Sequence, residues 1–135
     1  MVDKIKIAHI GIATYNIETT VKKYNAIPGT VFEGIEEVPS EGVRTAMLKV
    51  GNTHLEFLEP LNANSPVKKF LDTRGEGIHH IAFEVGSFNE VEAFIRTQTL
   101  TYLPGYPKIA EQGKKVAFLH PKSMNGVLVE FVSSE

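Results

Sequence analysis

The chain has 135 residues, of which 42% are hydrophobic and 22% charged, and its 14 basic and 16 acidic residues leave a net charge of −2 with neutral histidines. These values fit a single globular domain over residues 1–135 and argue against a general nucleic-acid binder, which carries a strong basic excess. No apolar run is long enough for a membrane span, and no cysteine is present for a disulfide or a thiolate metal site. The first residues lack a secretory signal, so we expect a cytoplasmic protein.

Alternation of apolar and polar residues, broken by glycine and proline, predicts the same order of elements twice along the chain. The first half reads as strand, helix, strand, turn and hairpin, at residues 4–13, 18–26, 31–38, 39–42, 43–50 and 53–58. The second half has predicted strands at 78–85, 115–120 and 126–132, a helix at 89–97 and a weaker strand near Thr101. Ser65 and Pro66 form a good helix start. A short helix at about 65–73 therefore joins repeats that span about 4–60 and 76–134.

The two halves also repeat residue by residue. AHIGIATYNIE aligns with HHIAFEVGSFNE so that His9 matches His80. The last strand of each half carries a glutamate in a similar context, LEFL at Glu56 and VEFV at Glu130. The histidines are 71 residues apart and the glutamates 74, which fits a longer hairpin turn in the second half. We therefore predict an α+β protein built from two βαβββ modules.

The four repeated residues are candidate ligands of one divalent metal ion. On its own face of a strand Glu130 lies between Leu128 and Val132, and Glu56 lies between His54 and Leu58. A carboxylate buried on such a face needs a strong partner. A lone strand histidine is more often simply hydrogen-bonded, and a lone strand glutamate usually faces solvent. The equivalence of His9 with His80, and of Glu56 with Glu130, favours convergence on one ion. Such a set suits Co2+, Zn2+, Mn2+, Ni2+ or Fe2+ and leaves open positions for an oxygen-chelating substrate.

The segments HIGIA, GNTHLEFLEPL, SPVKKFL, GIHHIAFEV and HPKSMNGVLVEF resemble the methylmalonyl-CoA epimerase family of the vicinal oxygen chelate superfamily, which also contains glyoxalase I. The resemblance runs from residue 7 to residue 131. It implies paired βαβββ modules that form a curled half-barrel around a metal ion, with Co2+ favoured, usually in a homodimer. It also implies that His9, Glu56, His80 and Glu130 are the metal ligands. His79, on the opposite face of its strand, would not be a ligand.

The activity implied by the resemblance is inversion at C2 of methylmalonyl-CoA through proton abstraction and a metal-stabilised enolate. Glu130 is then the candidate for one base. The family's second base is a glutamate in a P-E-x-G-V segment, and this chain has Pro-Ser-Glu-Gly-Val, which puts Ser40 at that position and Glu41 beside it. Glu41 is our candidate second base, with a solvated loop carboxylate as the alternative reading.

Substrate contacts are less marked in the sequence. Lys114, Lys115 and Lys122 near the last hairpin could meet the phosphates of an acyl-CoA, although solvated lysines are the alternative. The resemblance suggests a flap around Gly113 in the EQGKK segment. The rival functions are a glyoxalase I-like lactoylglutathione lyase or another metal-dependent isomerase or lyase, and a non-catalytic small-molecule binding protein. A ring-cleaving dioxygenase fits less well, because its iron site usually has two histidines and one carboxylate.

Overall fold

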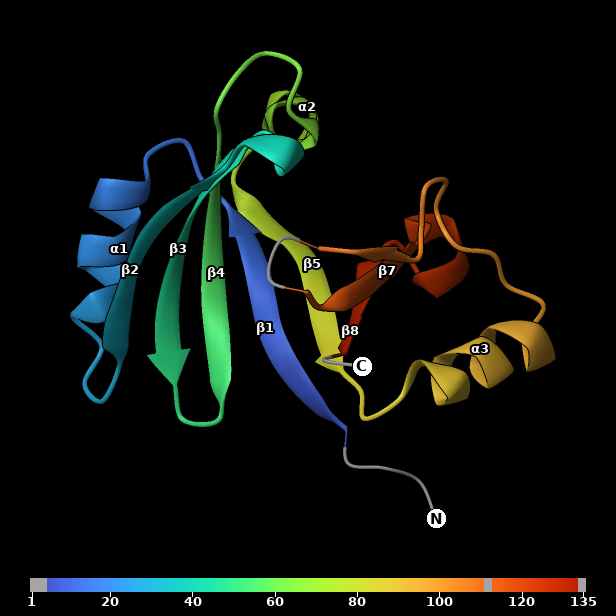
Figure 1. Ribbon diagram of the computed structural model, residues 1–135. Helices are drawn as coiled ribbons and strands as arrows, with labels where there is room; N and C mark the ends of the chain where they lie inside the picture. Colours follow the sequence, from blue (N-terminus) through green and yellow to red (C-terminus); the bar gives the residue numbers. More distant parts are fainter. Residues whose placement is uncertain (1–4, 111–112, 134–135) are drawn as a thin grey trace. The chain divides into compact units, whose positions relative to one another are not determined.

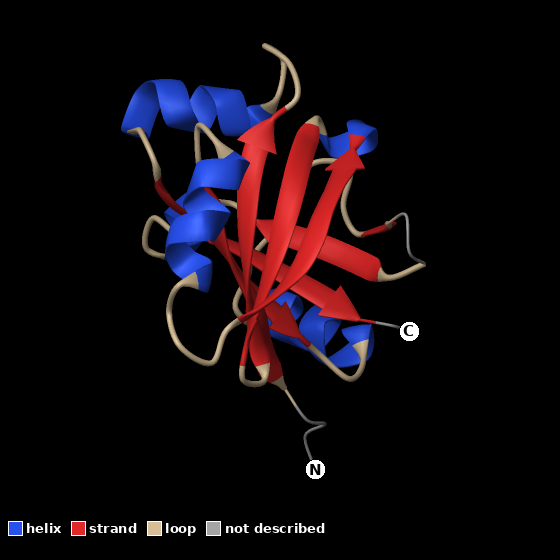
Figure 2. Cartoon of the chain, turned by 90° about the vertical axis from the view of Figure 1, so that its left-hand side faces the viewer, coloured by secondary structure: helices blue, strands red, loops and turns tan. Residues whose placement is uncertain are grey.

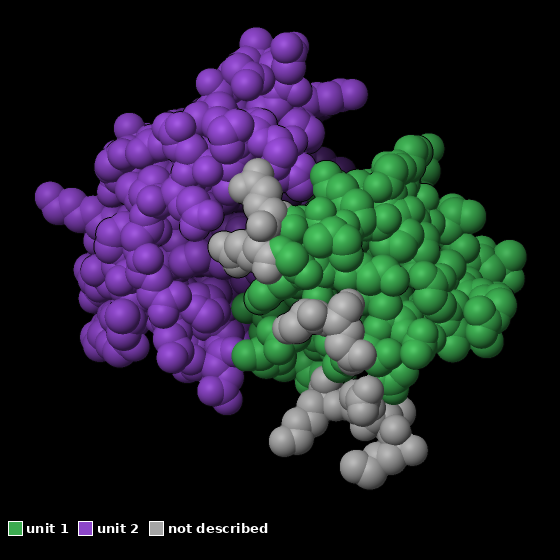
Figure 3. Space-filling view, in the orientation of Figure 1, with its two compact units in different colours: residues 1–8, 80–135 green, residues 9–79 purple. Residues whose placement is uncertain are grey.

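The computed structural model describes residues 5–110 and 113–133, which divide into two compact units (Figure 3). Unit 2 comprises residues 9–79, and unit 1 comprises the residues from 80 onward together with those up to 8. Each unit holds one predicted module, and the βαβββ order and the α+β class are confirmed (Figure 1). The elements of the first module and the connecting helix are β1 (Lys6–Ala13), α1 (Ile17–Asn25), β2 (Val31–Val38), β3 (Val43–Val50), β4 (Thr53–Pro60) and α2 (Pro66–Arg74). Those of the second are β5 (Gly77–Glu84), α3 (Phe88–Thr97), β6 (Lys108–Ile109), β7 (Lys115–Leu119) and β8 (Leu128–Ser133).

In unit 2 the strands follow the order β2-β3-β4-β1, and only the β1–β4 pair is parallel. Helix α1 begins where the side chain of Asn16 accepts a hydrogen bond from the backbone N–H of Thr19, as the sequence predicted. The helix covers one face of the sheet with a core of Ile17, Val21, Ala46, Leu48 and Phe57. The opposite face is covered at one end by α2, through Ala13, Val43, Leu58, Val67 and Leu71. The rest of that face is therefore left to the candidate functional residues.

Unit 1 repeats this plan with the order β5-β8-β7-β6 and a parallel β5–β8 pair. Helix α3 covers one face of these strands (Figure 2, helices in blue and strands in red). The core under α3 contains Phe88, Val91, Ile95, Ala117, Leu119, Val129 and Phe131. An apolar pocket of about 270 Å3, partly open to solvent, lies beside this core and is lined among others by Phe94, Met124, Val129 and Phe131. The core of the second module therefore borders unfilled apolar space.

The predicted elements differ from the observed ones mainly in the second module. The strand expected near Thr101 is reduced to one bridge between Tyr102 and Leu119. The short strand β6 at Lys108–Ile109 was not predicted, because two residues are too few to show a periodicity. The predicted connecting helix is confirmed, with the hydroxyl of Ser65 accepting from the N–H of Val67. Among the described residues no helix is long and apolar enough to cross a membrane.

Candidate metal and active site

Unit 2 brings His9 and Glu56 together. His9 lies on β1 and Glu56 on β4, and the parallel register pairs Gly11 with Glu56. Nε2 of His9 is 3.4 Å from Oε1 of Glu56, with the two side chains 13% and 17% exposed. Both residues lie on the face of the sheet opposite α1, since their neighbours Leu55 and Phe57 belong to the α1 core. A nitrogen and a carboxylate oxygen are thus held close together on a sheltered surface.

Unit 1 holds the equivalent pair, His80 and Glu130. Nε2 of His80 is 3.3 Å from Oε1 of Glu130, with the side chains 6% and 12% exposed. The register pairs Ala82 with Glu130. In each unit, therefore, the glutamate pairs with a small residue on the neighbouring parallel strand, and the histidine lies two residues before that small residue. The repeat seen in the sequence is a repeat of strand register and of side-chain contact.

The residues around the two glutamates leave room on the same face. Their partners on the parallel strands are small, Gly11 and Ala82. Their antiparallel partners are larger and apolar, Met47 beside Glu56 and Phe118 beside Glu130. Each pair alone is an ordinary contact between an imidazole and a carboxylate. Two such pairs in equivalent positions also provide the nitrogen and oxygen donors that a borderline divalent cation prefers.

The predicted second base lies outside these pairs. Ser40 and Glu41 belong to a short 3-10 helix, Pro39–Glu41, and both are exposed. Gly42 ends this turn with a left-handed φ of 68°, and a Cβ there would meet Cβ of Ser65 at 3.4 Å. The positive φ therefore favours a glycine at this position.

The lysines proposed as substrate contacts lie at different places in unit 1. Lys115 is half-buried, and its amino group lies 4.9 Å from the centre of the Phe88 ring on α3. This contact places Lys115 on the helix side of the sheet, away from the face that carries Glu130. Lys114 and Lys122 are exposed. Of the predicted flap, Gly113 is described, whereas residues 111 and 112 lie outside the described residues.

A further ion pair near the His9–Glu56 pair was not predicted. Nε2 of His54 lies 2.8 Å from Oε1 of Glu33, and both side chains are partly exposed. His54 pairs with His9 in the strand register, so the contact lies on the face that carries His9. The register of β2 shifts between Phe32 and Ile35, so simple alternation along the sequence could not assign Glu33 to a face.

Two other carboxylates stabilise the frame around β1 and α1. The carboxylate of Glu76 accepts hydrogen bonds from the backbone N–H of Tyr15 and the hydroxyl of Thr14, which lower the pKa of Glu76. Glu59 accepts from the backbone N–H of Ile17, the first residue of α1, at 3.0 Å. These contacts fix the ends of the strands that carry His9 and Glu56.

Comparison with known proteins identifies the family. The glyoxalase/bleomycin resistance protein/dioxygenase superfamily matches residues 8–118. This chain belongs to that superfamily. This chain is also 39% identical to the mitochondrial methylmalonyl-CoA epimerase of Dictyostelium discoideum, over 93% of this chain and 76% of the relative. It is 35% identical to the ethylmalonyl-CoA/methylmalonyl-CoA epimerase of Cereibacter sphaeroides, over 93% of this chain and 95% of the relative.

Solved structures also resemble this chain, and they include methylmalonyl-CoA epimerases. A variant of the Streptomyces coelicolor methylmalonyl-CoA epimerase, in complex with 2-nitronate-propionyl-CoA, matches with a TM-score of 0.85 and 38% identity, covering 99% of both chains. A hypothetical protein from Bacillus halodurans matches with a TM-score of 0.89 and 39% identity, covering 98% of this chain and 96% of that one. The chain is thus a member of the methylmalonyl-CoA epimerases, a family of isomerases, and the predicted fold class is confirmed.

Proposed function

We propose that this protein is a metal-dependent epimerase that inverts C2 of methylmalonyl-CoA. The observation that carries the proposal is the repeated His–Glu pair, in the same register and at 3.4 and 3.3 Å, within a chain related to methylmalonyl-CoA epimerases. The 2-nitronate-propionyl-CoA held by the Streptomyces relative supports a CoA thioester as the substrate class. A homodimer and a cytoplasmic location remain our expectations for the working protein.

His9, Glu56, His80 and Glu130 are the proposed ligands of one divalent ion, for which we favour Co2+ over Zn2+, Mn2+ or Ni2+. The fit rests on donor chemistry: in each unit an imidazole nitrogen and a carboxylate oxygen face one another on a sheltered surface. The two negative carboxylates match the charge of a divalent ion, and the two imidazoles add neutral nitrogen donors. When bound, the ion would supply Lewis acidity toward the thioester carbonyl of the substrate.

The protein's own residues have the remaining tasks. The C2 proton is weakly acidic because it lies alpha to the thioester carbonyl, so a positioned carboxylate can remove it when the resulting enolate is stabilised. Glu130, 12% exposed beside His80, is the proposed base on one face of C2. Glu41 is the base that the sequence predicts for the other face. Inversion is balanced without any co-reactant, because one C–H bond breaks on one face and one forms on the other.

Deuterium exchange tests the activity directly. The purified protein, loaded with Co2+, is incubated with one epimer of methylmalonyl-CoA in D2O. We expect formation of the other epimer with deuterium at C2. Absence of both deuterium and inversion, under conditions in which a known epimerase works, would refute the proposal. Turnover of the hemithioacetal of glutathione instead would favour the glyoxalase I-like alternative.

Metal binding is tested separately by thermal unfolding. Addition of Co2+ to protein treated with EDTA should raise the melting temperature, since a ligand at 100 times its dissociation constant stabilises by about 2.7 kcal/mol. A melting temperature that does not respond to Co2+, Zn2+ or Mn2+ would refute the metal site while leaving the exchange assay to judge the activity.

A further inference from the structure

The face of unit 2 that carries His9 and Glu56 holds another carboxylate, that of Glu36 on β2. Inversion at C2 needs a proton acceptor on each face of the carbon, and Glu130 accounts for one of them in the proposed function. The inference drawn here rests on that proposed function and concerns the residue that acts on the other face.

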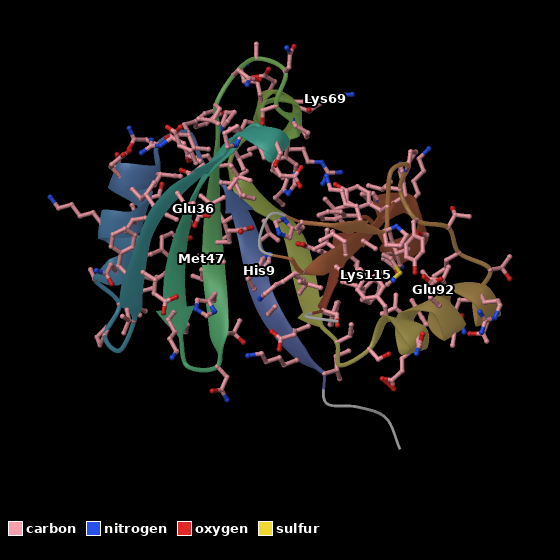
Figure 4. The ribbon with its side chains drawn as sticks, in the orientation of Figure 1. His9, Glu36, Met47, Lys69, Glu92 and Lys115 are labelled. Atoms are coloured by element: carbon pink, nitrogen blue, oxygen red, sulfur yellow. The ribbon has the colours of Figure 1, made fainter. Side chains whose placement is uncertain are left out.

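The strand register places Glu36 on this face. Glu36 pairs with Thr45 of β3, and Thr45 pairs with Leu58 of β4. Leu58 follows Glu56 by two residues, and side chains two residues apart in a strand point to the same face. Figure 4 labels Glu36 on β2 and His9 on β1, which are the two ends of the strand order β2-β3-β4-β1 in this unit.

The two neighbours of Glu36 confirm the assignment by pointing the other way. Ile35 pairs with Ala46, which is fully buried in the core under α1. Glu37 pairs with Arg44, whose guanidinium donates a hydrogen bond of 2.6 Å to Glu18 on α1. Both neighbours thus belong to the α1 side, and Glu36 between them belongs to the side of Glu56.

Of the β2 carboxylates on the face of Glu56, Glu36 is the one without a hydrogen-bond or ion-pair partner among the described residues. Glu33 is paired with His54 at 2.8 Å. Glu37 lies on the α1 side of the sheet. Within the described part of the chain, Glu36 makes no hydrogen bond or ion pair, and its side chain is exposed. A carboxylate on the active face with no structural partner is available to take up a proton.

Glu36 and Glu56 lie on the same face but are not direct neighbours. Glu36 is two strands away from Glu56 and two residues further along, which corresponds to about 12 Å between the Cα atoms. The residue next to it on β3, Thr45, has a short side chain and is 9% exposed. The side chain between Glu36 and β4 on this face is therefore short.

We propose that Glu36 is the second catalytic base of the epimerase. From one epimer its carboxylate accepts the C2 proton, the C–H electron pair enters the enolate, and a proton is returned to the other face by the group that serves that face in the proposed function. From the other epimer the two groups exchange roles. Glu41, in the exposed turn that follows β2, is the competing candidate, and the same experiment separates the two.

The experiment compares Glu36→Gln with Glu37→Gln, the neighbouring substitution on the opposite face of the same strand. Each Co2+-loaded variant is incubated in D2O with each epimer separately, and inversion and C2 deuterium are followed. We expect Glu36→Gln to lower the rate of inversion by about 100-fold or more. It should still exchange the C2 proton of one epimer, with retention of configuration, because Glu130 still serves its own face. Glu37→Gln should stay within about twofold of wild type, and both variants should melt as wild type does.

Wild-type inversion in Glu36→Gln would overturn the proposal. So would an equal loss of exchange from both epimers, since a base that serves one face must leave the other face active. One-sided exchange in Glu41→Gln, with Glu36→Gln unaffected, would assign the role to Glu41. If the wild-type protein neither exchanges nor inverts either epimer, the proposed function fails, and that result is distinct from an active enzyme in which Glu36 is dispensable.

Discussion

The apolar pocket beside the α3 core allows a test of packing in the second module, because the first module has a larger side chain at an equivalent position. Val129 lines the pocket of about 270 Å3 and immediately precedes Glu130. Its equivalent in the first module is Leu55, which immediately precedes Glu56 and packs against the α1 core. The register supports the match, since Leu119 pairs with Val129 as Leu48 pairs with Leu55. We therefore predict that Val129→Leu stabilises the protein.

The magnitude follows from one added methylene. Burying a methylene contributes about 0.8 kcal/mol, and Val129 borders an apolar pocket of about 270 Å3 that can receive it. The gain in the free energy of unfolding should thus be about 0.5–0.8 kcal/mol, or a melting temperature about 2–4 °C higher. The reverse change in the first module, Leu55→Val, removes one methylene and should cost about 0.5–1 kcal/mol.

Urea titration of the wild type and of both variants measures these differences, with the slope of each transition checked for equality. The two substitutions change side-chain volume in opposite directions at equivalent positions. The free energy of unfolding should therefore rise for Val129→Leu and fall for Leu55→Val. If Val129→Leu instead loses about 1–3 kcal/mol, as overpacking does, the reasoning about the pocket is refuted.

Three further predictions concern the metal ligands and the charged contacts of the frame. His9→Ala and His80→Ala should each weaken Co2+ binding by more than about 100-fold, to a similar extent because the two pairs are equivalent, as measured by calorimetric titration. Glu76→Gln should lower the free energy of unfolding at about pH 7 but not at about pH 3, since a carboxyl whose pKa is lowered on folding stabilises above its ordinary pKa and loses that effect as the pH falls; equal effects at both pH values would contradict this. Arg44→Met removes the hydrogen bonds that Arg44 donates to Glu18 and Glu59. The resulting loss in the free energy of unfolding should be smaller at about 1 M NaCl, because the Glu18 contact is exposed.

The sequence alone was sufficient to predict the modules and the paired residues. Alternation with a period of two identifies long strands, and a repeat fixes which positions correspond, so the internal repeat of the chain was enough to match His9 with His80. The contact of each histidine with its glutamate was seen only in the structure, where two parallel strand pairs with the same register bring equivalent side chains together twice. The helix caps at Asn16 and Ser65 were also predictable, since capping depends on residues close in sequence.

Only the tertiary structure decided which other side chains share the face of Glu56. The bulge in β2 interrupts alternation, so no sequence pattern could place Glu33 beside His54 or Glu36 opposite Thr45. Whether a core is filled likewise depends on how a helix sits on its sheet, and the segment around Val129 is as apolar as its counterpart, so its pattern does not reveal the pocket. Local patterns determine strands and repeats because they reflect neighbouring residues, whereas pairing between distant strands selects the side chains that meet at the site.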